Sequence, residues 1–539
     1  MIGEMPEKES QGQPKYDNSE GWHPGHNPWL VALTVTIATF MEVMDTSIAN
    51  VALPHIAGGL SAGQDESTWV LTSYLVANAV VLPISAWMSD RFGRKRFYMT
   101  CVALFTLSSF LCGLAPSLGA LVFFRVLQGL GGGGLGPSEQ AILADTLPAR
   151  QRGMGFAIYG MAVVLAPAIG PTLGGWITDH YSWRWIFYVN VPFGFLSMWL
   201  TQFMVTDPPW LQDARKRAKK ASVDFAGLFL IACGLGTFQV VLDKGQRDDW
   251  FSSPFITSFA VISVVSIIAF IFWDWHVEHP IVNLHLFKNR SYAISNLLMF
   301  LLGCVLLGTT VLIPQFLQTL MGYTAQKAGE VLTPGGFAVL LMLPLVGILV
   351  TKFDARWLIA FGFLSCGFAL MRLSHLNLDI SFETAMWWRI QQAASIAFLF
   401  VPINTISYIG IPVQQNNQVS AMVNLMRNMG SSVGISIFAT FLARRQQVHQ
   451  NFLTAHIQGA SVLYQNRVQN LSNYLATAGS NMVEAKTRAI GFISQTMMQQ
   501  AAVLAYVDVV SIFMITSFLA APVVFLAKRR KPGRPSMGH

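Results

Sequence analysis

The sequence carries few charged residues for its length. Of 539 residues, 12% are Asp, Glu, Lys or Arg, whereas 53% are hydrophobic and the mean hydropathy is +0.47. A soluble protein carries about 25% charged residues. The shortfall leaves too few charges to cover a water-facing surface of this size. It excludes an ordinary soluble protein and indicates lipid as the surrounding solvent.

Cysteine is also scarce, and a nucleotide-binding loop is missing. All five cysteines fall inside apolar segments, at Cys101, Cys112, Cys233, Cys304 and Cys366. This placement excludes a disulfide framework or a metal-ligand spacing and indicates packing residues. The run Gly131–Gly136 matches a dinucleotide-binding pattern only formally, because no strand precedes it; small residues instead let spanning helices approach closely. No Walker A sequence occurs, so we expect no ATP, metal or other cofactor.

Long apolar segments dominate what is present. A spanning helix needs roughly 20 apolar residues, and fourteen segments of this kind alternate with short polar turns. They lie near 28–53, 67–88, 97–115, 118–144, 153–178, 185–206, 224–242, 254–274, 292–316, 328–351, 356–373, 385–411, 419–443 and 504–527. The sequence therefore predicts an all-α membrane protein with fourteen transmembrane helices.

The net charge of +8 is distributed in a way that points to a membrane and away from nucleic acid. Lys and Arg gather in every second loop, at 91–96, 150–152, 215–220, 288–290, 352–356 and 528–534. Basic loops mark the cytoplasmic side of a membrane protein. We therefore expect both termini in the cytoplasm, which requires an even number of spans. The polar residues 1–27 show no signal-peptide pattern and are expected to form a cytoplasmic tail.

A strongly charged stretch at 207–223 divides the chain after six segments. The predicted organisation is a tail (1–27), a six-helix bundle (28–206), a basic linker with two inserted helices (207–283), a second six-helix bundle (284–527) and a basic tail (528–539). Arg125 with Gln128, and Arg389 with Gln392, repeat an Arg-x-x-Gln pattern in the fourth and twelfth helices. This repeat is weak evidence for two related bundles with the substrate site between them.

Residues 444–503 form a long connection before the last helix, on the external side of the predicted topology. Apolar residues recur there at helical spacing, as at Tyr464, Val468 and Leu471. We predict an amphipathic helical hairpin that projects outward, with a mobile loop as the alternative.

Two carboxylates stand out inside the first predicted helix. Glu42 and Asp45 are three residues apart and share one helical face. Charge inside a membrane is expensive, and two nearby carboxylates in a low dielectric resist double ionisation, so one of them can hold a proton. Arg125 in the fourth helix could neutralise the other. We predict that Asp45, Glu42 and Arg125 couple transport to protons; the alternative is a purely structural ion pair.

Other charged residues in apolar segments are secondary candidates. Glu139 lies toward the inner end of the fourth helix, Glu330 near the outer end of the tenth, and Arg389 and Arg427 in the twelfth and thirteenth. Each could have a functional role or could extend to the membrane interface, and the sequence does not decide between these readings.

Several motifs resemble those of the major facilitator superfamily. Asp90, Arg91, Gly93 and Arg94 resemble its gating motif between helices 2 and 3, and Gly170, Pro171, Gly174 and Gly175 resemble its antiporter motif in helix 5. The run 45–54, the segment 183–192 and the runs 242–251 and 279–282 resemble the fourteen-helix drug:proton antiporters of the EmrB/QacA type, closest to the EmrB branch. Ala86, Ala157 and Ala166 replace glycines of these motifs.

The resemblance implies the major facilitator fold, with two pseudo-symmetric six-helix bundles in a 6+2+6 layout. It implies a bacterial inner-membrane transporter, not an enzyme, that exports hydrophobic or amphiphilic compounds in exchange for protons. It also implies a periplasmic adaptor of the EmrA type and an outer-membrane channel as partners. We expect the helix 5 segment around Pro171 to seal the two bundles together when the site faces outward, which would limit proton leak. The alternatives are a dedicated exporter of one metabolite, such as a siderophore or fatty acid, and a non-transporting scaffold or receptor.

Overall fold

The computed structural model describes residues 25–148, 151–220, 223–277, 280–456, 461–477 and 481–528. Within these ranges every regular element is a helix. The α-helices are α1 (Pro28–Gly59), α2 (Gln64–Ser67), α3 (Trp69–Phe92), α4 (Arg94–Leu114), α5 (Leu118–Gly132), α6 (Leu135–Thr146), α7 (Arg152–His180), α8 (Trp185–Tyr188), α9 (Asn190–Met204), α10 (Pro209–Lys220), α11 (Phe225–Lys244), α12 (Pro254–His276), α13 (Arg290–Thr319), α14 (Ala325–Lys352), α15 (Ala355–Leu373), α16 (Phe382–Ser407), α17 (Asn416–His456), α18 (Val462–Thr477) and α19 (Met482–Val523). Four short 3-10 helices, η1 (Trp250–Ser252), η2 (Leu284–Lys288), η3 (Val413–Gln415) and η4 (Val524–Leu526), complete the described elements. The predicted tails, 1–27 and 528–539, lie almost entirely outside these ranges.

All fourteen predicted segments are helical. Among the described residues, eleven helices are long and apolar enough to cross a membrane, and twelve if the bent helix α7 is one span. The predicted fourth segment is divided into α5 and α6, and the sixth into α8 and α9. Two predicted segments are not among these eleven or twelve helices: the sixth, which is divided, and the thirteenth, which is part of α17. A fourteen-helix arrangement is therefore consistent with the structure.

Polar residues fix where many of the helices begin. Asn27, Ser117, Asn289 and Ser381 each accept a hydrogen bond through the side chain from a backbone N–H two or three residues ahead. Such caps satisfy donors that the first helical turn leaves unpaired. The polar turns between apolar segments therefore also define the ends of the spans.

Glycines allow the helices of the first bundle to pack closely. A Cβ atom at Gly129 would lie 2.4 Å from the carbonyl oxygen of Tyr74, and one at Gly131 would lie 2.8 Å from that of Cys101. These contacts bring α5 against both α3 and α4. The interpretation of the glycine run as a close-packing surface is confirmed.

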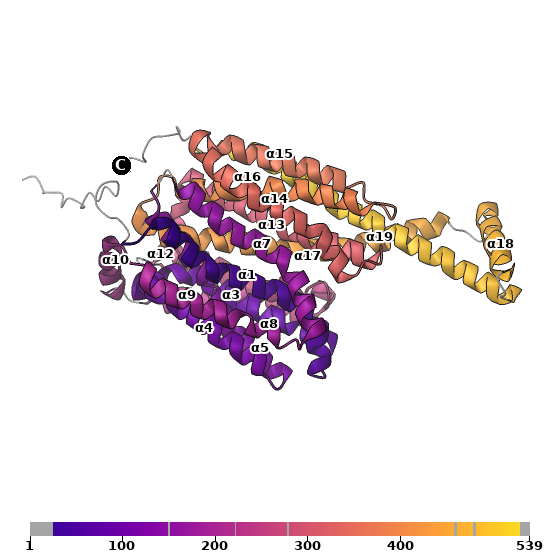
Figure 1. The fold of residues 1–539 in the computed structure, drawn as a ribbon, viewed down its shortest axis with the longest axis horizontal. Coiled ribbons are helices and arrows are strands. Elements are labelled where there is room, and N and C mark those ends of the chain that lie inside the picture. The colour runs from indigo at the N-terminus through magenta and orange to yellow at the C-terminus, as the bar shows by residue number, and fades with distance from the viewer. Residues whose placement is uncertain are drawn as a thin grey trace, which may run out of the picture.

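The helices form two bundles with matching internal packing (Figure 1). In the first bundle, α1 packs on α7, both α3 and α4 pack on α5, and α4 also packs on α9. In the second bundle, α13 packs on α17, both α14 and α15 pack on α16, and α15 also packs on α19. The bundles meet where α7 packs along α14 and where α3 packs on α17. The inserted helices α11 and α12 pack on each other, and α11 contacts α3 and α17. The predicted pseudo-symmetric architecture is confirmed.

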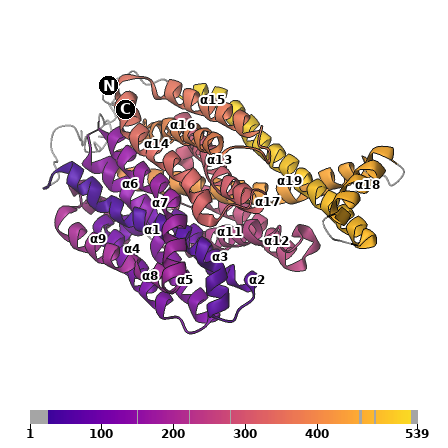
Figure 2. The ribbon, with the colours of Figure 1, turned by 45° about the vertical axis from the view of Figure 1, so that its right-hand side comes forward.

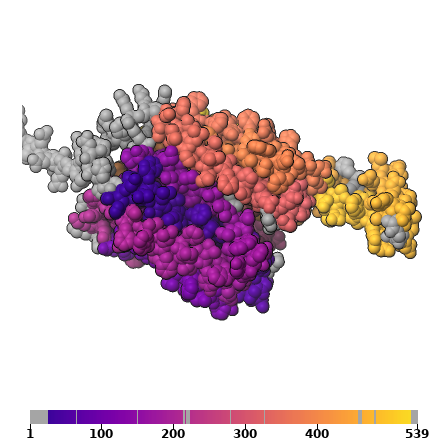
Figure 3. Space-filling view, viewed as in Figure 1, coloured from indigo at the N-terminus to yellow at the C-terminus, as the bar shows by residue number. Residues whose placement is uncertain are grey.

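A helical arm leaves the bundles at one end (Figures 1 and 3). The long helices α17 and α19 both continue beyond the bundle, and α18 packs against α19. Figure 2 shows the arm at the end opposite to the start of α1. The predicted helical projection is confirmed, but it is not a separate hairpin: two of its three helices are continuous with membrane helices.

Candidate functional site

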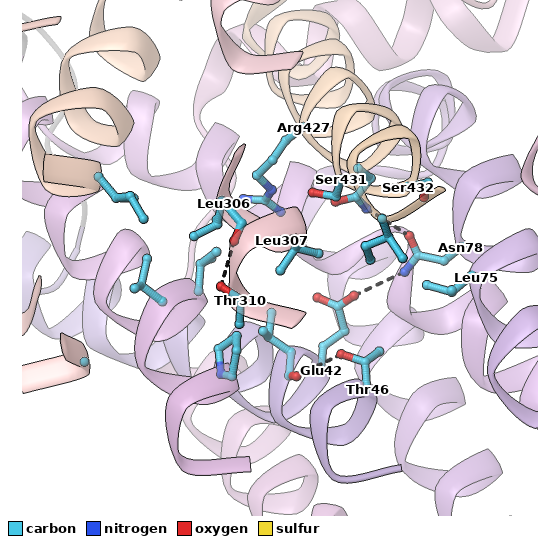
Figure 4. Close-up of a pocket in the computed structure, with 18 of the residues that line it drawn as sticks. Glu42, Thr46, Leu75, Asn78, Leu306, Leu307, Thr310, Arg427, Ser431 and Ser432 are labelled. Atoms are coloured by element: carbon cyan, nitrogen blue, oxygen red, sulfur yellow. Dashed lines mark hydrogen bonds between the residues drawn. The ribbon is translucent and has the colours of Figure 1, made fainter. Parts of the chain in front are cut away.

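A cavity lies between the two bundles (Figure 4). Its wall is built by α1, α3, α7, α11, α13, α14, α16 and α17, and most of it is apolar. The charged side chains that line it are Glu42 from α1, Arg389 from α16 and Arg427 from α17. Leucine, valine and isoleucine side chains surround them, so the cavity offers a few charges within an apolar enclosure, as small-molecule sites do.

Asp45 lies in a closed network beside this cavity. Its Oδ2 accepts a hydrogen bond from Nη1 of Arg125 at 2.5 Å, and its Oδ1 accepts from Nε2 of Gln128 at 3.0 Å and Nδ2 of Asn190 at 2.7 Å. The side chains of Asp45 and Arg125 are 1% and 0% exposed, and neither residue lines the cavity. The structure therefore joins the predicted acid and cation in a buried ion pair with two further amide donors.

Glu42 faces the cavity. Its Oε1 accepts hydrogen bonds from the hydroxyl of Tyr74 and from Nδ2 of Asn78, each at 3.1 Å, as Figure 4 shows for Asn78. One turn separates Glu42 from Asp45 on α1, but the two carboxylates have different neighbours. Glu42 is the carboxylate that a compound or a water molecule in the cavity can reach.

Tyr74 connects the two carboxylate environments. Its hydroxyl donates to Glu42, while its ring lies under the guanidinium of Arg125, 4.4 Å from the ring centre. A cation over an aromatic face is attracted to it. A change in the charge of Glu42 can therefore reach the Asp45–Arg125 pair through one side chain.

The second bundle contains a counterpart of this network. Nη1 of Arg389 donates to Oε1 of Gln392, as Arg125 donates to Gln128, and Nε2 of Gln392 donates to Oγ1 of Thr309 at 2.6 Å. Thr309 therefore occupies the position that Asp45 has in the first bundle. Within the described part of the chain, no carboxylate lies within ion-pair distance of Arg389.

The two remaining acidic candidates lie in different settings. Glu139 is 0% exposed and accepts hydrogen bonds from Thr39 and, at 2.7 Å, from Thr36. It is buried against α1, so the reading in which it extends to an interface is wrong. Glu330 is exposed near the start of α14 and does not line the cavity.

The gating-motif residues lie at the end of the molecule where α1 begins. Asp90 accepts a hydrogen bond from Nδ2 of Asn417 at 2.5 Å, and Arg94 pairs with Asp145, which also accepts from Asn416. Asn416 and Asn417 start α17, so these contacts join the two bundles. Two other motif residues act locally: the guanidinium of Arg91 lies over the ring of Trp87, and Gly93 adopts φ +96° between α3 and α4.

Further contacts of α17 close the space between this end and the cavity. Nδ2 of Asn424 donates to Oε1 of Gln140 at 3.0 Å, and Nη1 of Arg427 donates to the hydroxyl of Tyr159 at 3.0 Å. Nδ2 of Asn428 reaches Oδ1 of Asn78 at 3.4 Å. Polar residues on successive turns of α17 thus hold the first bundle from the gating motif up to the cavity.

Known proteins identify the fold and the family. A family model described as the Major Facilitator Superfamily matches residues 35–435. The chain belongs to the major facilitator superfamily. It is 34% identical to the fatty acid resistance protein FarB of Neisseria gonorrhoeae, over 92% of this chain and 96% of that one. It is 35% identical to the multidrug export protein EmrB of Escherichia coli (strain K12), over 79% and 83% of the two chains.

A solved structure agrees at the level of the fold. The proton:xylose symporter XylE superimposes with a TM-score of 0.56 at 14% identity, over 90% of this chain and 94% of that one. At this identity the match concerns the fold alone. The predicted relationship to the EmrB branch of the superfamily is confirmed, and the chain is a multi-pass membrane protein of a transporter family.

The antiporter motif of this superfamily member packs within one bundle. A Cβ atom at Gly170 would lie 2.4 Å from Oγ of Ser47, and one at Gly174 would lie 3.0 Å from Cγ2 of Ile48, so both glycines face α1. A Cβ atom at Gly175 would meet open space. These two glycines therefore contact α1, and the expectation that the segment seals the two bundles when the site faces outward stays a prediction.

Two other residues of this segment explain its connections. Pro171 has no N–H to donate to the carbonyl of Pro167, and that carbonyl accepts a hydrogen bond from Oγ of Ser47 at 3.4 Å. The contact with the second bundle comes from Thr172, whose Oγ1 lies 2.8 Å from where a Cβ atom of Gly329 would stand.

Sequence reasoning missed several polar residues of the site. Tyr74 and Asn78 stand four residues apart in an apolar segment, a spacing that places them on one helical face. Asn190 lies in the segment 183–192, to which the resemblance assigned no contact, although its side chain donates directly to Asp45. Polar side chains inside spans were the available signal, since an unsatisfied polar group in lipid is costly.

Proposed function

We propose that this transporter exports hydrophobic or amphiphilic compounds across the bacterial inner membrane in exchange for protons, by alternating access. The observation that carries the proposal is the pair of adjacent carboxylates on α1, one at the cavity wall and one paired with a buried arginine. The similarity to multidrug export proteins supports the substrate class. The proton gradient supplies the energy, and neither ATP nor another cofactor takes part.

The coupling step concerns the Asp45–Arg125 pair. A proton that enters the cavity is taken up first by Glu42, whose oxygen atoms are reachable there. Protonation of Asp45 then weakens its hold on Arg125 and favours one facing of the cavity, whereas bound compound favours the deprotonated form. Because an inward proton gains roughly 2.3 kcal/mol per 100 mV of membrane potential, this exchange can drive export.

The orientation follows from the basic loops. With both termini in the cytoplasm, the polar contacts of α17 lie on the cytoplasmic side of the cavity, and the arm lies outside. Cysteines introduced at Gln212 on α10 and at Asn473 on α18, both exposed, can be labelled with an impermeant reagent in cells with a permeabilised outer membrane. We expect labelling at position 473 and not at 212; the reverse pattern contradicts the orientation.

The arm is the proposed docking surface for a periplasmic adaptor of the EmrA type, which in turn contacts an outer-membrane channel. Leu463 on α18 is 83% exposed and Val483 on α19 is 76% exposed. Large apolar side chains exposed in this way mark interaction sites. Replacing both by Ser should spare compound binding in detergent and lower resistance in cells; undiminished resistance argues against docking there.

A dedicated exporter of one metabolite is the second candidate, since one relative is described as a fatty acid resistance protein. Purified protein in proteoliposomes with an imposed pH gradient separates the two. Competition among chemically unrelated compounds supports multidrug export, whereas transport of one compound without such competition supports the dedicated exporter. If no compound moves protons, the transport proposal itself fails.

A further inference from the structure

Among the residues that the structure describes, the buried guanidinium of Arg389 has no acidic partner. It is 7% exposed, and its Nη2 donates to Oγ1 of Thr310 at 3.2 Å while its Nη1 donates to Gln392. Both partners are neutral, and its Nε has no hydrogen-bond partner. A buried cation without a counter-charge is costly, so this arrangement calls for an anion that the described residues do not supply.

The unpaired guanidinium lies at the wall of the central cavity. Arg427 lines the same cavity from α17, while the one carboxylate among its described lining residues, that of Glu42, already accepts hydrogen bonds from Tyr74 and Asn78. Two cations therefore face one carboxylate, and the cavity carries an excess of positive charge. Between apolar walls such an excess attracts anions more strongly than it would in bulk water.

Much of the remaining cavity wall is apolar. Leu306, Leu332 and Ile396 are among the residues that line the same cavity as Arg389. Gly335 lets α14 approach α16, because a Cβ atom there would lie 3.2 Å from Cγ of Arg389. An anionic group that reaches Arg389 would therefore keep its remaining atoms in contact with hydrocarbon side chains, which favours a ligand with an apolar chain.

We propose that Arg389 is the headgroup site for anionic amphiphiles, which makes carboxylates with an apolar chain preferred substrates of the cavity. The carboxylate accepts hydrogen bonds from the guanidinium and supplies the negative charge that Asp45 supplies to Arg125. The apolar chain lies along the leucine and isoleucine wall. This inference rests on the proposed export function and specifies its substrate class.

The test measures binding of decanoate, decanol and decyltrimethylammonium to the purified full-length protein in nanodiscs. The three probes share an apolar chain and differ in the charge of the headgroup. Wild-type protein should bind decanoate about tenfold more tightly than decanol, because charged hydrogen bonds are roughly twice as strong as neutral ones. Arg389→Gln should remove that preference and leave decanol binding unchanged, and Arg389→Lys should restore part of it.

Arg372→Gln is the matched control. This arginine lies on α15, is exposed, and donates to Gln391, away from the cavity. Its loss should leave all three affinities unchanged, and decanol binding reports whether each variant is folded. A wild-type preference for the cationic probe, or a decanoate preference that survives in Arg389→Gln, would overturn the inference.

The same preparations distinguish this failure from failure of the export function. Proton-driven transport of neutral or cationic compounds, without decanoate preference, refutes the headgroup site and leaves the transporter intact. Decanoate binding without any proton-driven transport refutes the exchange mechanism and leaves the headgroup site intact.

Discussion

Both bundles contain the same arginine–glutamine motif, but the residue beside it is charged in the first bundle and neutral in the second. In the first, Asp45 neutralises Arg125 at 2.5 Å; in the second, the neutral Thr309 receives the hydrogen bond from the motif glutamine. Thr309 follows Asp45 by the same number of residues as Arg389 follows Arg125. The second bundle thus has the same helix geometry, with a hydroxyl in place of the carboxylate. As a result, Arg125 forms an ion pair, whereas Arg389 lines the cavity with only neutral hydrogen-bond partners among the described residues.

The difference in surroundings explains why both arrangements are stable. Arg125 is 0% exposed and does not line the cavity, so a ligand in the cavity does not reach its guanidinium to compensate its charge. Arg389 stands at the cavity wall, where water or a ligand can do so. A buried cation needs a fixed partner only where it cannot be reached. This difference supports the proposal that the ion pair of the first bundle changes with protonation, while the cavity-facing cation of the second binds the ligand.

The largest effect on stability and transport should come from removing the carboxylate of Asp45 in the first bundle. Asp45→Asn leaves Arg125 buried without its counter-charge, which should lower the free energy of unfolding by about 3–5 kcal/mol. The variant should bind compound yet show no proton-driven efflux and no proton release. Stability in detergent and transport in proteoliposomes measure the two effects. Asp179→Asn, which removes a carboxylate that is 67% exposed, is the control.

A wild-type rate of proton-dependent efflux in Asp45→Asn would place the coupling site elsewhere. Glu139, which is buried against α1 and hydrogen-bonded to two threonines, is then the next residue to replace.

Glycine contacts offer a second comparison between the bundles. A Cβ atom at Gly434 on α17 would lie 2.3 Å from the carbonyl oxygen of Cys304 on α13, whereas one at Gly174 on α7 would first meet the side chain of Ile48 at 3.0 Å. Backbone cannot move aside as a side chain can. Gly434→Ala should therefore cost about 1–3 kcal/mol of stability and Gly174→Ala less, as thermal unfolding can measure. Equal losses would contradict this reading.

Adding a carboxylate at position 309 should give Arg389 the ion-pair partner that Arg125 has in the first bundle. In Thr309→Asp the new side chain lies next to Gln392 and can pair with Arg389, as Asp45 pairs with Arg125. Decanoate binding should weaken about tenfold, while stability should be kept or increased. Thr309→Asn, which adds the same volume without charge, should retain decanoate binding. Weak binding in both variants would assign the effect to shape and not to charge.

Much of the fold could be predicted because each span needs its own apolar segment. The fourteen segments, the paired bundles and the helical arm follow from hydropathy, basic loops and helical spacing. The breaks between α5 and α6 and between α8 and α9 were missed, because the apolar pattern continues through them. The sequence spacing correctly placed Glu42 and Asp45 on one helical face. Only the packing of other helices against that face gives the two carboxylates different hydrogen-bond partners.

The same limit applies to the rest of the site. The Arg-x-x-Gln repeat identified Arg389 as the counterpart of Arg125, but nothing in four residues shows that Thr309 replaces the acid. The contact between Thr309 and Gln392 is formed only in the folded protein, where α13 packs against α16. The sequence also did not show that Gly170 and Gly174 pack on α1, since a glycine face does not indicate which helix it meets.

The smallest effect should come from the carboxylate that faces the cavity. In Glu42→Gln the amide oxygen can still accept hydrogen bonds from Tyr74 and Asn78, so the shape of the cavity wall is kept. The Asp45–Arg125 pair also remains, and export should continue. Because one titrating group at the cavity is lost, the rate of proton-driven efflux should depend less steeply on external pH than in wild type. Efflux measured over a range of pH, with Glu330→Gln as an exposed control, tests this. An unchanged pH profile would assign proton uptake to the pair itself and remove Glu42 from the coupling route.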